Sequence, residues 1–266
     1  IHRAVTGPSF EKSFLEVKGS SNLKARFYVS ASGSSGTLAA GDYLKDNLNA
    51  KIAVVEALEC PTLLYNGYGE HNIQGIGDKH VPLIHNVMNT DFVVGVSDQA
   101  TNNLNLIFNT TVGQNYLNKK HSFEIDFIKR LPEFGFSTIA NILASIKLAK
   151  YMRLGSDDAI ITVATDGADL YLSELNKTKE DFKGIFDEFS CAEIFGQYLK
   201  GVNIDNTLEC NQKDRERIFN LGYYTWVEQQ GVNLDDFEKR RDQNFWNDHY
   251  KYMLSLDDKI KEFNSL

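Results

Sequence analysis

The chain has 266 residues, of which 42% are hydrophobic and 24% are charged, and its formal net charge is −8. These values are ordinary for a globular protein, and the length allows one large domain or two modest ones. An acidic chain without a long basic run argues against nucleic acid or an anionic membrane as the main partner. It does not argue against a small anionic ligand, because local backbone dipoles bind phosphate whatever the net charge.

Three cysteines, Cys60, Cys191 and Cys210, lie far apart and have no metal-type spacing. Scattered thiols in odd number are typical of a reducing compartment. No apolar run approaches the ~20 residues of a membrane-spanning helix, and the N-terminus has no signal-peptide pattern. We therefore expect a cytoplasmic protein, although its first residue is Ile1 rather than methionine.

Up to about residue 175, short apolar or β-branched runs alternate with segments of helical periodicity. The runs at 26–30, 51–56, 92–96 and 159–164 predict strands, and the segments at 38–48, 99–117 and 137–153 predict helices. Apolar strands that alternate with helices are typical of a parallel sheet covered on both faces. The sequence therefore predicts an α/β fold with a mainly parallel, twisted sheet.

The character of the chain changes near residue 176. Long charged and aromatic stretches follow, such as 213–228 and 234–252, and none of them reads as a strand. We interpret residues 1–175 as an α/β domain and 176–266 as a helical extension. Its many aromatic side chains should pack either on the sheet of their own chain or in a dimer contact, with Trp226 and Trp246 as candidate anchors.

The segment Gly33-Ser34-Ser35-Gly36-Thr37 stands between a predicted strand and a predicted helix. Glycines let the backbone turn sharply, and the helix that follows offers free N–H groups and the positive end of its dipole. This composition favours a phosphate cradle, although a plain turn would look similar. The nucleotide-binding P-loop and the dinucleotide fingerprint are excluded, because neither GK[ST] nor GxGxxG is present.

Gly135-Phe136-Ser137-Thr138 precedes the predicted helix at 137–153. One interpretation is the GxSxG turn of a hydrolase, but Ile139 stands where the last glycine should be. A second is a helix N-cap, for which Ser and Thr are favoured. A third adds to the cap a hydroxyl turned toward a bound ring nitrogen.

Other polar clusters give weaker signals. His71, His80 and His85, with Asp78 nearby, fit no familiar ligand spacing, so no metal site is predicted. The acidic pairs 157–158 and 166/169 are typical of solvated or capping carboxylates.

Taken in order, six segments resemble the cysteine synthase group of fold-type II pyridoxal-phosphate enzymes, which includes cystathionine β-synthase. The resemblance covers residues 1–175. The segments, with the family patterns they resemble, are Thr6-Gly7-Pro8 (TGPE), Gly33-Ser34-Ser35-Gly36-Thr37 (GTGGT), Val54-Val55-Glu56 (VxVE), Ile73-Gln74-Gly75-Ile76-Gly77 (IQGIG), Gly135-Phe136-Ser137-Thr138 (GISS), and Asp166 with Tyr171-Leu172-Ser173 (DxGxxYLS).

The resemblance implies pyridoxal 5'-phosphate as the cofactor, with its phosphate held by Gly33, Ser34, Ser35, Gly36 and Thr37. It also implies that Ser137 contacts the pyridine nitrogen and that Gly75 lies beside the substrate, where Asp78 would place a charge. A neutral hydroxyl on the ring nitrogen suits β-replacement or β-elimination on a serine- or cysteine-like amino acid. A homodimer is implied as well, because relatives in this family are commonly dimers.

Departures from the family pattern leave the substrate open. Ser35 replaces a glycine of the phosphate loop, Ile139 replaces the glycine after GISS, and the extension from Asn176 has no counterpart in ordinary cysteine synthases.

In the family, the Schiff-base lysine and the loop that grips the substrate carboxylate precede TGPE. No lysine of this chain matches that context, and Lys24 looks like a surface residue.

We therefore interpret the chain as the C-terminal part of an enzyme, with the lysine in a missing N-terminal half and the fragment alone inactive. The alternative is a non-catalytic, cofactor-binding or regulatory module that lost the lysine.

Overall fold

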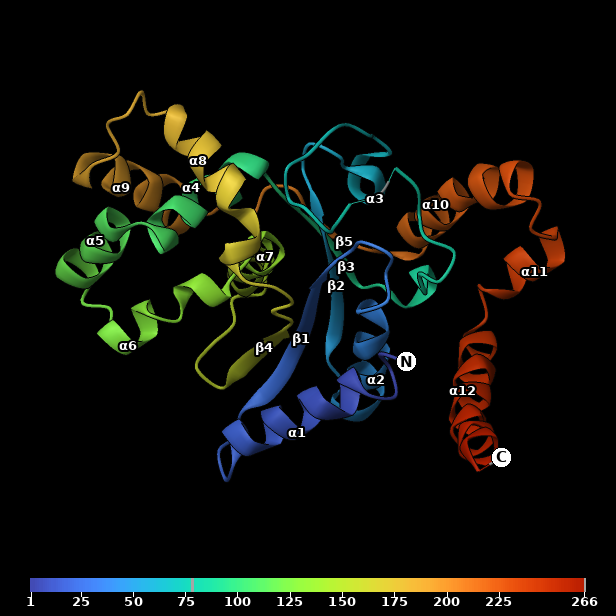
Figure 1. Cartoon of the computed structure of the whole chain (residues 1–266). Helices are drawn as coiled ribbons and strands as arrows, with labels where there is room; N and C mark the ends of the chain where they lie inside the picture. Colours follow the sequence, from blue (N-terminus) through green and yellow to red (C-terminus); the bar gives the residue numbers. More distant parts are fainter. Residues whose placement is uncertain (78, 266) are drawn as a thin grey trace.

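The computed structural model describes residues 1–77 and 79–265, which fold around one central five-stranded sheet (Figure 1). The strand order is β4-β1-β2-β3-β5; the pairs among β1 to β4 are parallel, and β5 pairs antiparallel with β3. The strands are β1 (Lys24–Ala31), β2 (Lys51–Ala57), β3 (Phe92–Val96), β4 (Asp158–Thr162) and β5 (Thr207–Glu209). The predicted α/β fold with a mainly parallel sheet is confirmed, and the four predicted strands differ from β1 to β4 only at their ends.

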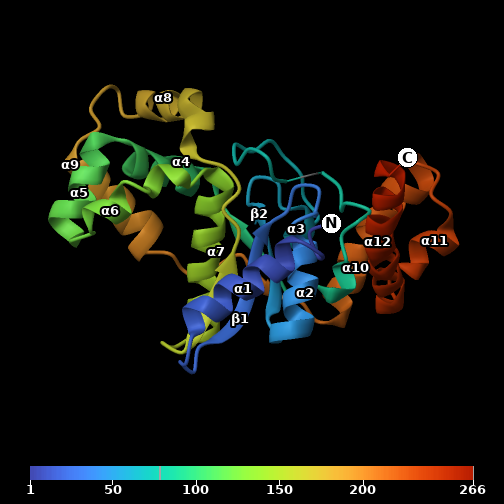
Figure 2. The same ribbon diagram turned by 60° about the horizontal axis from the view of Figure 1, so that its bottom comes forward.

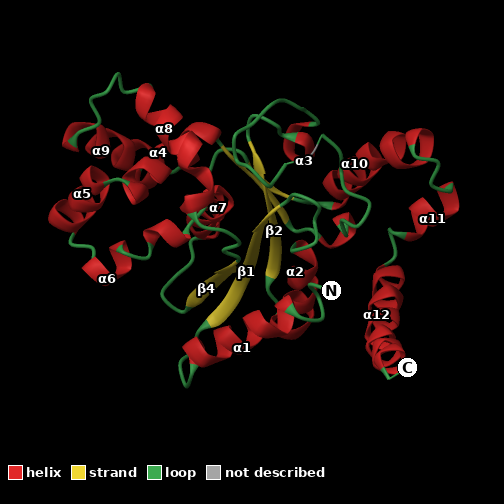
Figure 3. Cartoon of the chain, viewed as in Figure 1, coloured by secondary structure: helices red, strands yellow, loops and turns green. Residues whose placement is uncertain are grey.

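Helices cover both faces of the sheet (Figures 1 and 3). The central strands are buried on both sides, as β3 shows with all five residues buried, and this explains their continuous apolar runs. One face carries α4 (Asp98–Asn109), α5 (Thr111–His121), α6 (Ile125–Ile128), α7 (Phe136–Met152), α8 (Leu172–Glu180) and α9 (Glu188–Phe195) (Figure 2). The other side carries α1 (Thr6–Lys18), α2 (Leu38–Leu48), α3 (Thr62–Tyr65) and α10 (Gln212–Tyr223), followed by α11 (Leu234–Lys239) and α12 (Gln243–Asn264).

Five short helical segments connect these elements. They are the 3-10 turns η1 (Val87–Asn89), η2 (Leu131–Glu133) and η3 (Ala168–Tyr171), and the π-helical turns η4 (Gly196–Lys200) and η5 (Tyr224–Gln229). Among the described residues, no helix combines the length and the apolar character that crossing a bilayer requires.

The predicted single helix at 99–117 is two helices. α4 ends at Asn109, and the side chain of Thr110 accepts the N–H of Gly113 at 3.1 Å, which caps the start of α5. A threonine that can cap a new helix competes with continuation of the old one. The break lets α4 and α5 both pack their apolar sides into one core.

The expectation that no strand follows residue 176 is wrong. β5 joins the sheet edge, and backbone bonds from Gly95 N to Asn206 O and from Cys210 N to Asp91 O, both 2.8 Å long, flank it. Three residues are too few to give a periodic signal in the sequence.

The rest of the extension packs mostly on its own chain. Phe195 of α9 lies in the core with α4, α5 and α7, and Ile218 and Phe219 of α10 are buried against β2 and β3. Trp226 donates its indole N–H to Val81 O at 2.7 Å. α12 differs from the other long helices, because none of its residues is buried.

Candidate functional site

A small cavity lies at the carboxyl ends of β1, β2 and β4. Its volume is about 160 Å³, and its walls come from the loop after β1, the IQGIG segment that follows β2 and α3, the residues after β4, and the first turns of α7. Parallel strands end at the same edge of a sheet, and ligands of open α/β sheets bind outside that edge. The structure thus brings together three segments that are far apart in the sequence. They contribute Gly33, Ser34, Ser35, Gly36 and Thr37, then Gly75, and then Ser137.

Hydroxyl groups hold the loop after β1 in place. Thr37 Oγ1 lies 2.8 Å from Ser30 Oγ, and the Tyr28 hydroxyl donates to Thr37 O at 3.0 Å. Ser35 Oγ lies 3.1 Å from Ser32 Oγ, and Ser35 has a positive φ of 66°. Glycine adopts this conformation most easily, so a hydroxyl contact to Ser32 stabilises the strained serine.

The loop leaves its backbone donors free. Within the part of the chain that the structure describes, the N–H groups of residues 33–37 have no protein hydrogen-bond acceptor. α2 begins directly after them, and the side chain of its N-cap residue, Thr37, does not cap it. Unpaired N–H groups at a helix N-terminus form a site for an anion such as phosphate.

The IQGIG segment is fixed against this loop by its backbone. Gly77 donates its N–H to Ser32 O at 2.7 Å, and Gly75 and Gly77 have φ values of 78° and 74°. A residue with a side chain adopts such angles at a cost. The two glycines therefore let the segment fold back over the cavity.

Glu56, the last residue but one of β2, holds the start of the connection that leads from β2 to the IQGIG segment. Its carboxylate accepts the N–H groups of Leu63 at 2.9 Å and Leu64 at 2.8 Å, at the start of α3. Glu56 is only 3% exposed, and burial raises its pKa to about 7 against the opposing effect of these bonds and of Arg217.

Ser137 lies in the first turn of α7, on the side of the sheet edge where the phosphate loop lies. It is not the N-cap: Gly135 occupies that position and the helix start has no side-chain cap, so the N-cap interpretation is wrong. Ser137 Oγ lies 3.1 Å from Thr165 Oγ1.

Thr165 connects this serine to a carboxylate. Thr165 Oγ1 donates to Asp166 Oδ1 at 3.1 Å, and the Tyr171 hydroxyl donates to Asp166 Oδ2. Burial, and then the Asp166 carboxylate, raise the pKa of the Tyr171 phenol, so Tyr171 keeps its proton.

Asn141 is a cavity residue that the sequence reasoning missed. It is 1% exposed, its Nδ2 donates to Val163 O at 3.0 Å, and its Oδ1 has no partner among the described residues. A buried acceptor without a donor is costly, so such an atom points to a missing ligand or water. The sequence did carry one signal: Asn141 follows Ser137 by four residues, and residues four apart on a helix lie on the same face.

Among the described residues, the histidines at 71, 80 and 85 do not line the cavity. Asp78 lies outside the described residues. His85 is buried, its Nε2 lies 3.0 Å from Thr90 Oγ1, and burial lowers its pKa to about 3. No cluster of three or more His, Cys, Asp or Glu suited to a metal ion occurs in residues 1–77 and 79–265.

No lysine is present among the described residues that line the cavity. Lys24, the first residue of β1, is exposed. Lys147 of α7 is buried, but its ammonium group donates to Asp205 O at 2.7 Å, which ties α7 to the loop before β5.

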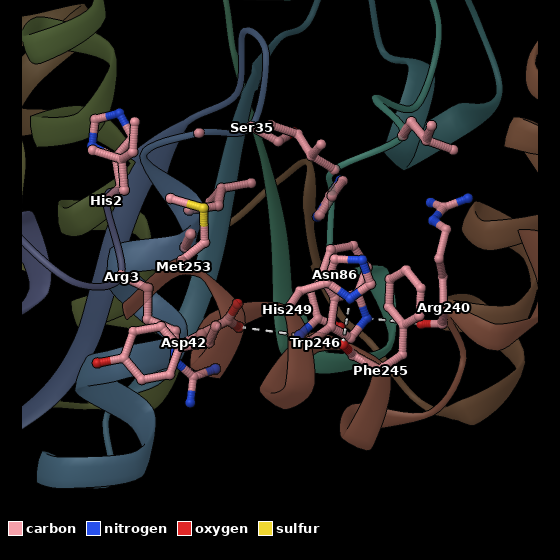
Figure 4. Close-up of a pocket in the computed structure, with 18 of the residues that line it drawn as sticks. His2, Arg3, Ser35, Asp42, Asn86, Arg240, Phe245, Trp246, His249 and Met253 are labelled. Atoms are coloured by element: carbon pink, nitrogen blue, oxygen red, sulfur yellow. Dashed lines mark hydrogen bonds between the residues drawn. The ribbon is translucent and has the colours of Figure 1, made fainter. Parts of the chain in front are cut away.

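A larger cavity, of about 950 Å³, separates the sheet from the C-terminal helices (Figure 4). Its walls are mainly apolar and come from the N-terminal residues, α2, residues 83–86, α11 and α12. Arg240 is 4% exposed there and lies over the rings of Phe219 and Phe237, while Arg3 lies over Tyr250. His2, Ser35 and Gly36 border both cavities, but only the smaller one is also lined by the rest of the glycine loop and by Ser137.

Comparisons with known proteins agree with this geometry. No protein-family model matches the chain. Cysteine synthase B of Campylobacter jejuni is 30% identical over 161 residues, which are 60% of this chain and 46% of that protein. The solved cysteine synthase of Entamoeba histolytica aligns with a TM-score of 0.53 and 24% identity, covering 75% of this chain and 51% of its own. A hydrogen sulfide-producing enzyme of Fusobacterium nucleatum aligns with a TM-score of 0.51 and 24% identity, over 73% of this chain and 50% of that enzyme's chain.

The structural alignments show the fold, an open α/β sheet. The sequence match goes further: over 161 residues the chain is similar to a cysteine synthase, a member of the fold-type II pyridoxal-phosphate enzymes. It spans about half the length of the relatives it matches.

Proposed function

We propose that the smaller cavity holds pyridoxal 5'-phosphate, and that the whole protein carries out β-replacement or β-elimination on a serine- or cysteine-like amino acid. The observation that carries the proposal is the cradle of unpaired N–H groups at 33–37, in one cavity with Ser137. In this assignment the phosphate accepts from the cradle, and the ring nitrogen lies at Ser137.

The residues present fit such a group at both ends. Free N–H donors at the start of α2 match phosphate oxygens, which only accept hydrogen bonds. At the other end, Asn141 offers a buried acceptor that no described residue satisfies. A ligand with an anionic group at one end and a ring nitrogen at the other would use both features.

When bound, pyridoxal phosphate supplies an electron sink for bonds at the α-carbon of an amino acid. The protein's own contribution is to bind and orient. The loop at 33–37 fixes the phosphate, Ser137 fixes the ring, and Gly75, whose backbone folds over the cavity, borders the substrate. Glu56 does not touch the cavity; it holds the start of α3, in the connection that leads from β2 to the IQGIG segment.

The base and covalent partner in this chemistry must be a lysine, and no described cavity residue is one. We therefore propose that the lysine belongs to the half of the family chain that residues 1–266 do not cover. That half is the first partner of this chain; a second copy, in a homodimer, is the other. Three free, buried cysteines suit a cytoplasmic location.

A non-catalytic module that kept the cofactor site without the lysine is the second candidate. If residues 1–266 act alone, the lack of a lysine among the described cavity residues favours this module. The coding sequence before Ile1 separates the two: a lysine followed by a Ser/Thr-Gly-Asn loop supports the enzyme, whereas a start codon supports the module.

Two measurements test the proposal. Calorimetric titration with 4'-deoxypyridoxine 5'-phosphate, which needs no lysine to bind, should show one site that inorganic phosphate competes for. The protein expressed with any upstream segment should then release sulfide or a keto acid from cysteine or O-acetylserine. Binding without turnover favours the module, and the absence of phosphate-competed binding contradicts both candidates.

A further inference from the structure

The hydrogen bonds beside Ser137 have a direction. Asp166 carries a carboxylate, which only accepts, so the single proton of the Thr165 hydroxyl points to Asp166 Oδ1. Thr165 Oγ1 must then accept in its 3.1 Å contact with Ser137. The Ser137 proton is therefore directed at Thr165, and Ser137 Oγ can offer only lone pairs to the cavity.

Asn141 adds a second acceptor on the same face of α7. The Val163 carbonyl can only accept, so the bond of 3.0 Å to it identifies the amide nitrogen of Asn141 and fixes the orientation of the amide group. Oδ1 is then the free atom, buried and without a donor among the described residues. Ser137 Oγ and Asn141 Oδ1 both require a hydrogen-bond donor.

We infer that this end of the cavity selects a ring nitrogen that carries a proton, and that Thr165, Asp166 and Asn141 set this preference. The inference rests on the proposed cofactor site. It differs from the expectation drawn from the family resemblance, in which a neutral hydroxyl partner leaves the pyridine ring less electron-withdrawing than a carboxylate partner would. A protonated ring withdraws electrons more strongly, so this chain would bind its cofactor in a more electron-withdrawing form.

Few charged or titratable groups face this end of the cavity. The Asp166 carboxylate accepts a hydrogen bond from the hydroxyl of Tyr171, which packs against Phe136 of α7. His2 borders the cavity, and its Nδ1 contacts Thr6 Oγ1 at 2.9 Å. Asp169 lies on η3 close to Gly167, but has no bond to Thr165.

The test uses 4'-deoxypyridoxine 5'-phosphate with ¹⁵N in the ring. The ¹⁵N chemical shift separates a pyridinium from a pyridine, and a pH series gives the pH at which the bound ring loses its proton. In the wild type this pH should lie above that of the free analogue. Asp166→Asn, whose amide can donate to Thr165 and so release the Ser137 proton, should lower it by about one unit or more, the equivalent of one charge-assisted hydrogen bond.

Asn141→Leu, which removes the second acceptor at similar volume, should lower the same pH. Asp169→Asn is the matched control: it removes a neighbouring charge without touching Thr165 and should leave the pH unchanged. Phosphate affinity reports whether each variant keeps the site. A bound ring that is neutral in the wild type, or that responds equally to Asp166→Asn and Asp169→Asn, overturns the inference. Failure of the analogue to bind the wild type overturns the proposed function instead, and the inference with it.

Discussion

Gly33 lies directly against the backbone of Gly75: a Cβ atom at position 33 would stand 2.7 Å from the Gly75 carbonyl oxygen. Real Cβ atoms do not approach a backbone oxygen so closely. The phosphate loop and the IQGIG segment are therefore in contact through backbone atoms, and the contact depends on glycine at position 33. Two motifs separated by about forty residues form a single wall.

Gly33→Ala should push the two segments apart. The expected result is a loss of affinity for 4'-deoxypyridoxine 5'-phosphate of about tenfold or more, since moving one cradle donor out of range costs at least ~1.4 kcal/mol. Titration calorimetry measures this. Gly196→Ala is the control, because a Cβ there meets no atom within 4 Å. Equal affinity in the two variants would mean that the wall is not a ligand site.

Ser137→Ala should lower turnover of the whole protein by about tenfold while cofactor is retained. Apart from its contact with Thr165, the hydroxyl touches only the ring in the proposed site, and the loss corresponds to one hydrogen bond of about 1.4 kcal/mol. Ser145→Ala removes a hydroxyl from the same helix, where it donates to Asn141 O at 2.7 Å away from the cavity wall, and should leave turnover unchanged. Unchanged turnover in Ser137→Ala would exclude the role at the ring nitrogen.

The sheet could be predicted because its strands are short apolar runs, such as β3, in which every residue is buried. The clustering of the glycine loop, Gly75 and Ser137 followed from the family motifs. β5 could not be predicted, because the three residues Thr207–Glu209 form a strand only by pairing with β3 at the edge of the sheet. Asn141 and Thr165 were missed for a related reason: an unsatisfied acceptor and a relay of hydroxyl protons are properties of three-dimensional contacts.

Glu56 should make the folded state less stable as the pH rises. Its pKa is raised from 4.5 to about 7 in the folded chain, so the stabilisation is fully present below about 4.5 and is lost as the pH rises through 7. A shift of this size corresponds to roughly 3 kcal/mol in the free energy of unfolding. Asp42, with a pKa raised to about 6, adds a slope of the same sign.

Denaturant titrations at pH 5 and pH 8 measure this slope. Glu56→Gln should reduce it, at a cost of about 1 kcal/mol at pH 5, because one of the two backbone N–H groups loses its acceptor. Glu16→Gln, at a side chain that is 68% exposed, should not change it. If the slope of Glu56→Gln equals that of the wild type, the buried carboxyl does not titrate in this range.

The homodimer proposal can be tested at α12, but not by deleting the whole extension. Removing everything after residue 176 would take β5, Ile218 and Phe219 away from the sheet and should unfold the protein. α12 itself buries no residue, and its apolar side chains Ile260 and Phe263 are 56% and 74% exposed. Together with Met253 and Leu256 they recur at helical spacing and form one stripe, as expected of a helix that packs on another molecule.

The double substitution Ile260→Lys with Phe263→Lys should convert the dimer to a monomer at the same concentration. Burying two charges in an apolar contact costs several kcal/mol, whereas the fold loses nothing that was buried. Ser255→Lys with Asp258→Asn changes the net charge equally on the opposite face of the helix and should leave the dimer intact. Sedimentation equilibrium measures the oligomeric state of the wild type and of both variants. A dimer that survives the stripe substitutions places the subunit contact elsewhere, and a wild type that is already monomeric refutes the homodimer.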